Sequence, residues 1–483
     1  MIHLKAIGKI MGALLFLIGV LMLPAAAISW LYSENSNPIM ISAAISLFIG
    51  MVLFFSFSKQ DEFVRKREGY LIVALSWIFM TGFGMLPFLL SKEIVSVSDA
   101  IFETMSGLTT TGASILTDIE VMPKGLLFWR SMTQWIGGLG IIVLTVAIFP
   151  LLGIGGIELF VAESPGPTSD KVHPRISETA KRLWYVYVGL TLLASLLYWA
   201  GGMTLYDAVN HGLTTMATGG FSTKNASMAY YDAYPFIQYT AVVFMFLAGT
   251  NFTLIYFGLI GKFHRILKSD EFKSYALAVG MLTLILFIPI VSQSDYGWEF
   301  SFRKAIFQVV SLITTTGFVT DDYTQYGQGV TFICFMLLFL GASAGSTAGG
   351  IKFVRHATFL KNTWLEFKRI VHPRAIVPLI INGERVTGRI INNIMNFLLI
   401  YLITFVGGSL VISLMGYDFA TSLGAVATCL GNVGPAIGDV GPVDNFSFFS
   451  PEAKLMLSFL MLLGRLELFT ILILFTPFFW RAN

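Results

Sequence analysis

Long apolar runs dominate the chain, and they alternate with short polar segments. About 20 consecutive apolar residues cross the hydrocarbon core of a bilayer, so the pattern predicts ten membrane-spanning helices. The chain is therefore expected to be an all-α polytopic membrane protein. The predicted spans are residues 8–32, 38–57, 69–91, 125–150, 181–202, 233–260, 272–293, 328–350, 390–415 and 455–480.

The connecting segments differ in charge, and this difference predicts the orientation. Most of the 31 lysines and arginines fall in alternate segments, which the positive-inside rule assigns to the cytoplasm. Both termini are then cytoplasmic. Acids such as Glu103, Asp118 and Asp439 lie in the other segments, where we expect them to gather cations at an outer mouth. The basic segments are 1–9, 58–68, 151–182, 261–275, 352–389 and the tail at Arg481.

Composition supports a membrane protein and excludes several functions. The chain is 55% hydrophobic and only 12% charged, whereas soluble proteins carry roughly twice that share of charge. Membrane lipid is thus the expected surrounding. The net charge of +3, without a basic tail, gives no sign of a nucleic-acid partner. The histidines show no metal-ligand spacing, and no phosphate-binding motif is present, so we expect no cofactor on this chain.

Four outer segments share a feature that organises the chain. Each holds a short apolar stretch that starts near a small residue and ends, 12 residues later, at a glycine in a polar run. Two of these runs, Thr109–Gly112 and Thr314–Gly317, are identical. The constant spacing predicts an internal repeat of about 100 residues. The small residues are Ala100, Ala208, Ala305 and Ser422, and the glycines are Gly112, Gly220, Gly317 and Gly434.

This repeat predicts the domain organisation. Two N-terminal helices, within residues 1–68, precede four pseudo-symmetric units of helix, re-entrant loop and helix around a central ion pore. A short helix cannot cross ~30 Å of hydrocarbon at 1.5 Å per residue, so it enters and returns. Irregular backbone at that depth is tolerated only where it is buried in protein or lines a polar path. The four units are residues 69–150, 181–260, 272–360 and 385–483.

The polar runs suit the binding of a dehydrated cation by backbone carbonyls. Adjacent carbonyls must point the same way, and glycine adopts the required alternation of backbone hand at little cost. The short helices end at the runs, so their partial negative charge also favours a cation. The candidate ion-coordinating residues are Thr110, Thr111, Gly112, Thr218, Gly219, Gly220, Thr315, Thr316, Gly317, Asn432, Val433 and Gly434.

These runs carry a resemblance to a known family. Ser106–Ala113, Ala217–Thr223, Thr315–Phe318 and Gly431–Pro435 resemble the four filters of the Trk/Ktr/HKT potassium transporter superfamily. Further stretches agree, including Gln134–Ile141, and the resemblance covers essentially the whole chain.

The resemblance implies a function and partners. It implies K⁺ uptake across a bacterial inner membrane, a homodimer, and gating by a cytosolic nucleotide-binding regulatory subunit (TrkA-like). K⁺ would be the transported ion, held at Thr111, Gly112, Gly220, Thr316, Gly317 and Gly434.

Residues 341–350 interrupt a predicted span with ten small residues. Each glycine there costs about 1 kcal/mol against alanine in a helix. The segment is either a mobile loop that obstructs the path or a site of close helix packing. We favour the loop, since the resemblance implies an intramembrane gate here. The candidate gating residues are Gly345, Ser346, Thr347, Gly349 and Gly350.

Arg465 lies inside the last apolar run, where a charge costs at least ~2.5–3.5 kcal/mol. It is either a structural ion-pair partner or, as the resemblance implies, a gating barrier in the path below the filter. Glu467, two residues on, points to a different side of a helix. Lys352 and Arg355, just beyond the small-residue segment, are expected to face the cytosol.

Three alternatives stay open at this stage. An H⁺- or Na⁺-coupled K⁺ symporter predicts a relay of intramembrane carboxylates or histidines, and few exist besides Glu467. His211 is interpreted as a packing or hydrogen-bonding residue. A less selective transporter of Na⁺ and K⁺ is the second alternative. A membrane enzyme is the third, and the absence of a catalytic constellation argues against it.

Overall fold

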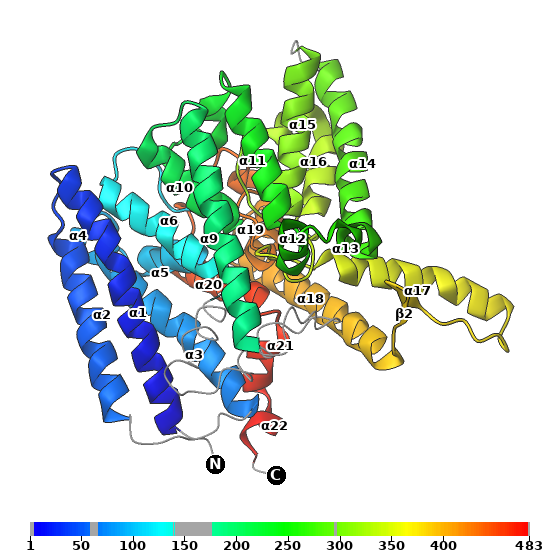
Figure 1. Ribbon diagram of the computed structural model, residues 1–483, viewed down its shortest axis with the longest axis horizontal. Helices are drawn as coiled ribbons and strands as arrows, with labels where there is room; N and C mark the ends of the chain where they lie inside the picture. The colour runs from blue at the N-terminus through cyan, green and yellow to red at the C-terminus, as the bar shows by residue number, and fades with distance from the viewer. Residues whose placement is uncertain (1–3, 58–65, 139, 141–175, 294–296, 482–483) are drawn as a thin grey trace.

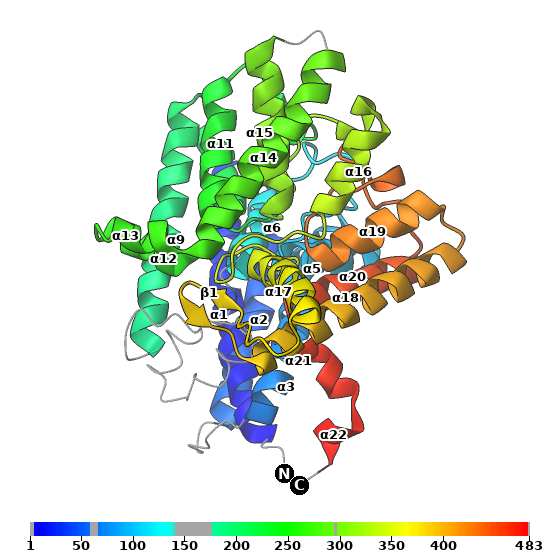
Figure 2. The same ribbon diagram turned by 90° about the vertical axis from the view of Figure 1, so that its right-hand side faces the viewer.

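The computed structural model describes residues 4–57, 66–138, 140, 176–293 and 297–481 of the chain. Two N-terminal helices, α1 (Leu4–Leu31) and α2 (Asn37–Ser56), pack together at one flank (Figure 1). The first helix of the chain and its last helix, α22 (Pro477–Trp480), reach the same end of the molecule in Figures 1 and 2.

Four short helices converge on the centre of the molecule, and they confirm the predicted re-entrant segments. Each is 12 to 16 residues long and is too short to span a bilayer. Some start with clear caps: the Thr204 side chain accepts from the backbone N–H of Asp207, and Asp418 accepts from that of Ala420. The four helices are α5 (Val97–Leu108), α10 (Leu205–Met216), α15 (Trp298–Ile313) and α19 (Phe419–Gly431).

A long apolar helix precedes each short one. Among the described residues, six helical stretches are long and apolar enough to cross a membrane, or up to eight if each bent pair counts as one span. The helices before the short ones are α3 (Lys66–Gly84) with α4 (Leu86–Ser91), α9 (Ile176–Ala200), α14 (Asp270–Gln293) and α18 (Gly388–Leu414).

Three of the helices that follow the short ones are interrupted, so the predicted spans 233–260, 328–350 and 455–480 are not continuous helices. Two of them bend by 108° and 109°. Asn251 starts a new helix by capping the N–H of Thr253 at 2.8 Å, while Glu467 and Leu468 adopt positive φ. Most of the predicted span 125–150 beyond Gly138 lies outside the described residues. The segments are α6 (Lys124–Gly138), α11 (Pro235–Ala248) with α12 (Phe252–Leu259), α16 (Gly327–Leu337), and α20 (Pro451–Arg465) with α21 (Phe469–Leu472).

One helix leaves the bundle. α17 (Phe353–Val371) projects away together with a two-stranded hairpin, in which Ile380 pairs with Arg385 (Figures 1 and 2). The remaining elements are α13 (Phe263–Lys268), β1 (Ile380–Ile381), β2 (Glu384–Arg385), η1 (Ser227–Tyr231), η2 (Tyr323–Tyr326), η3 (Gly438–Val440) and η4 (Ile473–Phe475).

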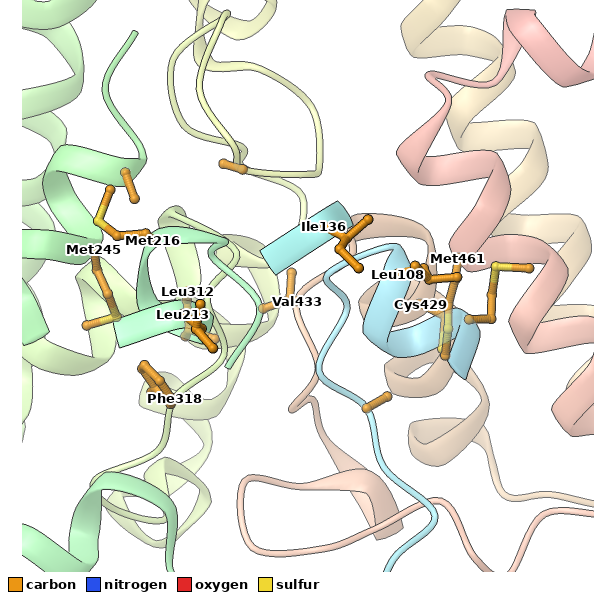
Figure 3. Close-up of a cluster of buried hydrophobic side chains, with 14 of the residues drawn as sticks. Leu108, Ile136, Leu213, Met216, Met245, Leu312, Phe318, Cys429, Val433 and Met461 are labelled. Atoms are coloured by element: carbon orange, nitrogen blue, oxygen red, sulfur yellow. The ribbon is translucent and has the colours of Figure 1, made fainter. Parts of the chain in front are cut away.

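The ends of the short helices are held in a common apolar core. Leu108, Met216 and Leu312 come from three different short helices, and all are at least nine-tenths buried (Figure 3). Ile136 of α6 and Val433 belong to the same cluster. Because interiors this densely packed deform little, the core fixes the polar segments that follow the helices.

Candidate functional site

Four loops follow the short helices and share one backbone conformation. We name them loop one (109–113), loop two (217–221), loop three (314–318) and loop four (432–436). In each, the glycine and the residue two before it have positive φ, so the predicted alternation of backbone hand is present. The earlier residues are Thr110 (54°), Thr218 (52°), Thr315 (54°) and Asn432 (54°), and the glycines are Gly112 (83°), Gly220 (76°), Gly317 (75°) and Gly434 (104°).

The four loops close into a ring, which we call the four-loop ring. A Cβ atom on each glycine would fall within 3.0 Å of the carbonyl oxygen that precedes the glycine of the next loop. The overlap is smallest at Gly434, at 2.8 Å. The candidate ion-coordinating residues therefore meet, and only glycine fits where they do. The facing pairs are Gly112 with Gly219, Gly220 with Thr316, Gly317 with Val433, and Gly434 with Thr111.

Threonines brace loops one and three in the same way. Thr109 Oγ1 donates to the Met105 carbonyl at 2.7 Å and lies 2.8 Å from Thr111 Oγ1. In loop three, Thr314 Oγ1 lies 2.7 Å from Thr316 Oγ1 and makes the matching bond to the preceding helix. The identical letters of the two runs thus correspond to identical geometry.

Loops two and four are braced by other means. Gln134 of α6 donates from Nε2 to the Gly219 carbonyl at 2.5 Å. Asn432 donates from Nδ2 to Thr111 Oγ1 at 3.0 Å and to the Met461 carbonyl at 2.9 Å, which ties loop four to loop one. Sequence reasoning assigned no role to Gln134, because nothing in the chain marks a side chain from another helix as a loop partner.

Buried polar groups hold the residues that follow loops one and two. Glu103 accepts from Arg130 Nε at 2.6 Å and from the backbone N–H of Ile115 at 2.9 Å. The prediction that Glu103 belongs to an outer mouth is wrong, since its side chain is fully buried. Burial of this carboxylate is tolerated because Arg130 compensates its charge. His211 Nε2 lies 2.9 Å from Ser222 Oγ, so it is a hydrogen-bonding residue, as expected.

Three other acids of the segments predicted to be external, Asp322, Asp439 and Asp444, lie near one another. Burial raises the pKa of the Asp444 carboxyl above its ordinary value, and the nearby charges of Asp322 and Asp439 act in the same direction. These carboxylates lie close enough to influence one another, so they give this region a negative field.

The segment 341–350 lies against three of the four loops. Thr347 Oγ1 lies 3.3 Å from Thr218 Oγ1, and the N–H of Gly349 donates to Thr315 Oγ1 at 2.7 Å. A Cβ on Gly349 would lie 2.7 Å from the Asn432 side chain. These three partners are the non-glycine residues with positive φ in loops two, three and four. The small residues of the segment thus fit directly under the ring.

The other candidate gating residues shape this segment. Gly345 has a φ of 71°, and its carbonyl accepts from the N–H of Phe252 at 3.0 Å. Ser346 donates from Oγ to the Ser343 carbonyl at 2.6 Å, and Gly350 has a φ of 65°. Two glycines with left-handed backbone let the segment turn twice in ten residues.

Arg465 joins three parts of the chain below the ring. It donates from Nη1 to the Thr347 carbonyl at 2.8 Å and from Nη2 to the carbonyls of Gly137 and Gly138, the latter at 2.8 Å. It therefore links α20 to the segment 341–350 and to the end of α6. A guanidinium carries five N–H groups, so it can serve all three carbonyls at once.

Glu467 forms an ion pair with Arg355, at the start of α17. The prediction that Arg355 faces the cytosol is wrong, since the residue is only 5% exposed. Burial of the charge is tolerated because the carboxylate compensates it. Within the described part of the chain, no group of three histidine, cysteine or acidic residues could hold a metal ion.

Comparisons with known proteins agree with this architecture. The chain matches the TrkH cation transport protein family over residues 35–482. It is 39% identical to the Trk system potassium uptake protein TrkH of Vibrio parahaemolyticus, covering 99% of both chains. It is 34% identical to the Trk system potassium uptake protein TrkG of Escherichia coli, with the same coverage. These relatives are named as transporters, not enzymes.

The fold agrees as well. The crystal structure of the potassium transporter TrkH from Vibrio parahaemolyticus superimposes with a TM-score of 0.89 at 37% identity, covering 99% of this chain and 100% of that one. The family predicted from the four runs is confirmed. The chain belongs to the TrkH family of cation transport proteins.

Proposed function

We propose that the chain takes up K⁺ through the four-loop ring, where backbone carbonyls replace the water shell of the ion. The observation that carries this proposal is the closed ring in which each glycine faces the carbonyl of the next loop. The names of the relatives, which are potassium uptake proteins, support it. The proposed K⁺ ligands are at Thr111, Gly112, Gly220, Thr316, Gly317 and Gly434.

The short helices add an electrostatic contribution. Each ends at the ring, and a helix C-terminus carries about half a unit of negative charge. Four such ends favour a cation over an anion. Loops one and three keep their braced threonines, so we expect them to hold the ion most tightly.

The segment 341–350 and Arg465 are the proposed gate. The support is their position: the segment bonds to Thr218 and Thr315, and Arg465 bonds to the Thr347 carbonyl. A guanidinium below the ring repels a cation by its charge. Opening requires the segment to release these hydrogen bonds.

The proposed setting is a homodimer in the bacterial inner membrane, surrounded by lipid, with both termini cytoplasmic. A cytosolic, TrkA-like nucleotide-binding subunit would move the gate. The relatives are named as proteins of a Trk system, and this name supports the presence of a partner subunit. K⁺ is then the transported ion, and the chain itself binds no cofactor.

Flux without coupling is favoured over an H⁺- or Na⁺-driven symport. Glu103 and Glu467 are each paired with an arginine. His211 has both ring nitrogens within hydrogen-bond distance of oxygens, at 2.8 and 2.9 Å. A relay needs groups that exchange protons or ions in turn, and these three groups are occupied by structural partners.

The test is growth at low K⁺ of a bacterial strain that lacks its own uptake systems. Expression of the chain together with its regulatory subunit should restore growth. Absence of growth, with the protein present in the membrane, would refute K⁺ uptake. Isotope flux into vesicles, with K⁺, Rb⁺ and Na⁺ competed separately, then separates a K⁺ transporter from a less selective one.

A further inference from the structure

One face of α6 lies against loop two and the residues beside it. Arg130, Gln134 and Gly138 are four residues apart and therefore share this face. Arg130 Nη1 donates to the Ser222 carbonyl at 3.3 Å. Gly138 packs so closely that a Cβ there would lie 2.7 Å from Ala217 Cα. Gln134 lies between these two contacts.

The Gln134 carboxamide forms hydrogen bonds with the backbone of loop two at two points. The residue is fully buried. Its Nε2 donates to the Gly219 carbonyl at 2.5 Å, and its Oε1 accepts from the N–H of Phe221 at 3.0 Å. Because one partner is an acceptor and the other a donor, only a carboxamide of this length satisfies both.

These two hydrogen bonds lie beside a position at which loop two lacks a side chain. The residue before the ring glycine is Thr111 in loop one, Gly219 in loop two, Thr316 in loop three and Val433 in loop four. Only loop two has no side chain there. A Cβ on Gly219 would overlap the carboxamide of Gln134, so the carboxamide occupies the space that a side chain fills in the other loops.

The carbonyl of Gly219 also differs from its three counterparts. In the part of the chain that the structure describes, no hydrogen bond is made to the carbonyls of Thr111, Thr316 or Val433. A carbonyl oxygen has two lone pairs, so the Gly219 oxygen can accept from Gln134 and still face the ring. The donor fixes its direction.

We propose that Gln134 is a positioning residue that holds the Gly219 carbonyl in the ring and thereby sets the preference for K⁺ over Na⁺. The inference rests on the proposed function, since it assumes that the ring selects the ion. Without the carboxamide, the Gly219 carbonyl can turn toward the axis and follow a smaller ion. Loop two then accepts Na⁺ more readily, because a flexible cage does not discriminate by size.

The test uses the full-length protein in vesicles and measures the K⁺/Na⁺ flux ratio and the KM for K⁺. Gln134→Leu and Gln134→Met keep most of the side-chain volume and remove its hydrogen bonds to loop two. One lost hydrogen bond is worth about 0.5–1.5 kcal/mol, so the ratio should fall about twofold to tenfold. Gln238→Leu is the matched control: Gln238 is also fully buried, but it donates to the Met228 carbonyl outside the ring. It should leave the ratio unchanged.

A double-variant cycle separates positioning from general stability. Gly219→Thr alone should be severe, because its side chain overlaps Gln134. Gly219→Thr combined with Gln134→Ala supplies the threonine of loops one and three in the vacated space, and it should recover part of the ratio. A cycle without recovery, or Gln134 variants with an unchanged ratio, would overturn the inference.

Two further outcomes are decisive. Gly112→Ser, measured in parallel, reports on the ring itself. If it changes the ratio while the Gln134 variants do not, this inference alone fails; if it too leaves the ratio unchanged, the proposed function and the inference fail together. Loss of all Gln134 variants from the membrane, with Gln238→Leu retained, would show a role in folding and would overturn the claim of selectivity.

Discussion

Substitution of Gly112 by serine perturbs the ring at one known contact. Gly112 has a φ of 83°, where a residue with a side chain is strained by about 1–2 kcal/mol. The new Cβ would also overlap the Gly219 carbonyl oxygen. That oxygen has to retreat by roughly 1 Å to reach ordinary van der Waals distance.

A carbonyl displaced this far no longer matches the ion that the ring was shaped for. If the substitution destabilises the K⁺-bound state by about 1.4 kcal/mol more than the Na⁺-bound state, the K⁺/Na⁺ flux ratio drops about tenfold. The effect should be smaller for Gly434→Ala, because the overlap at Gly434 is the smallest of the four. It should be at least as large for Gly317→Ala.

The assay is isotope flux into vesicles, with K⁺ and Na⁺ competed against a labelled Rb⁺ tracer. Gly407→Ser is the matched control, since Gly407 lies in α18 with no atom within 4 Å of a Cβ built there. A Gly112→Ser protein with an unchanged flux ratio would refute the reasoning. So would a ratio that falls equally in the Gly407 control.

Three more predictions concern the gate and the scaffold. Arg465→Ala should raise K⁺ flux severalfold in vesicles and lower its dependence on the regulatory subunit, since the barrier charge is lost; unchanged flux would contradict this. Glu467→Gln leaves Arg355 buried without its carboxylate and should destabilise the protein by about 3–5 kcal/mol in thermal denaturation, whereas Arg355→Met with Glu467→Leu should cost less. Glu34→Ala removes the carboxylate that accepts from the backbone N–H groups of Lys124 and Gly125; it should lower stability by about 1 kcal/mol without changing the flux ratio.

Much of the site could be predicted from spacing alone. The 12-residue interval identified Gly112, Gly220, Gly317 and Gly434, and the structure brings all four together. Glycine was informative because its role here is a property of the backbone. No other residue adopts the left-handed conformation and also leaves room for a neighbouring carbonyl.

The breaks in the second helices could not be predicted in the same way. Residues 249–251 and 466–468 are short interruptions between apolar stretches, so hydropathy averaged over a long window indicates one span where the structure has two helices. What decides the break is local capping, as at Asn251, and contact with the segment 341–350, as in the bond from the Phe252 N–H to the Gly345 carbonyl. Contacts between distant segments leave no periodic pattern in a single chain.

The supports of the four loops explain why the repeats diverged in sequence while the ring did not. A carbonyl ring requires one backbone conformation four times, but each copy can be braced by any group that reaches it. Loop one is braced by Thr109, loop two by Gln134 from a neighbouring helix, and loop four by Asn432 within its own run. Side chains in equivalent positions are therefore not equivalent in function. Substitution of the residue immediately before the ring glycine should have its largest effect in loop two, because Gln134 already fills the space beside Gly219.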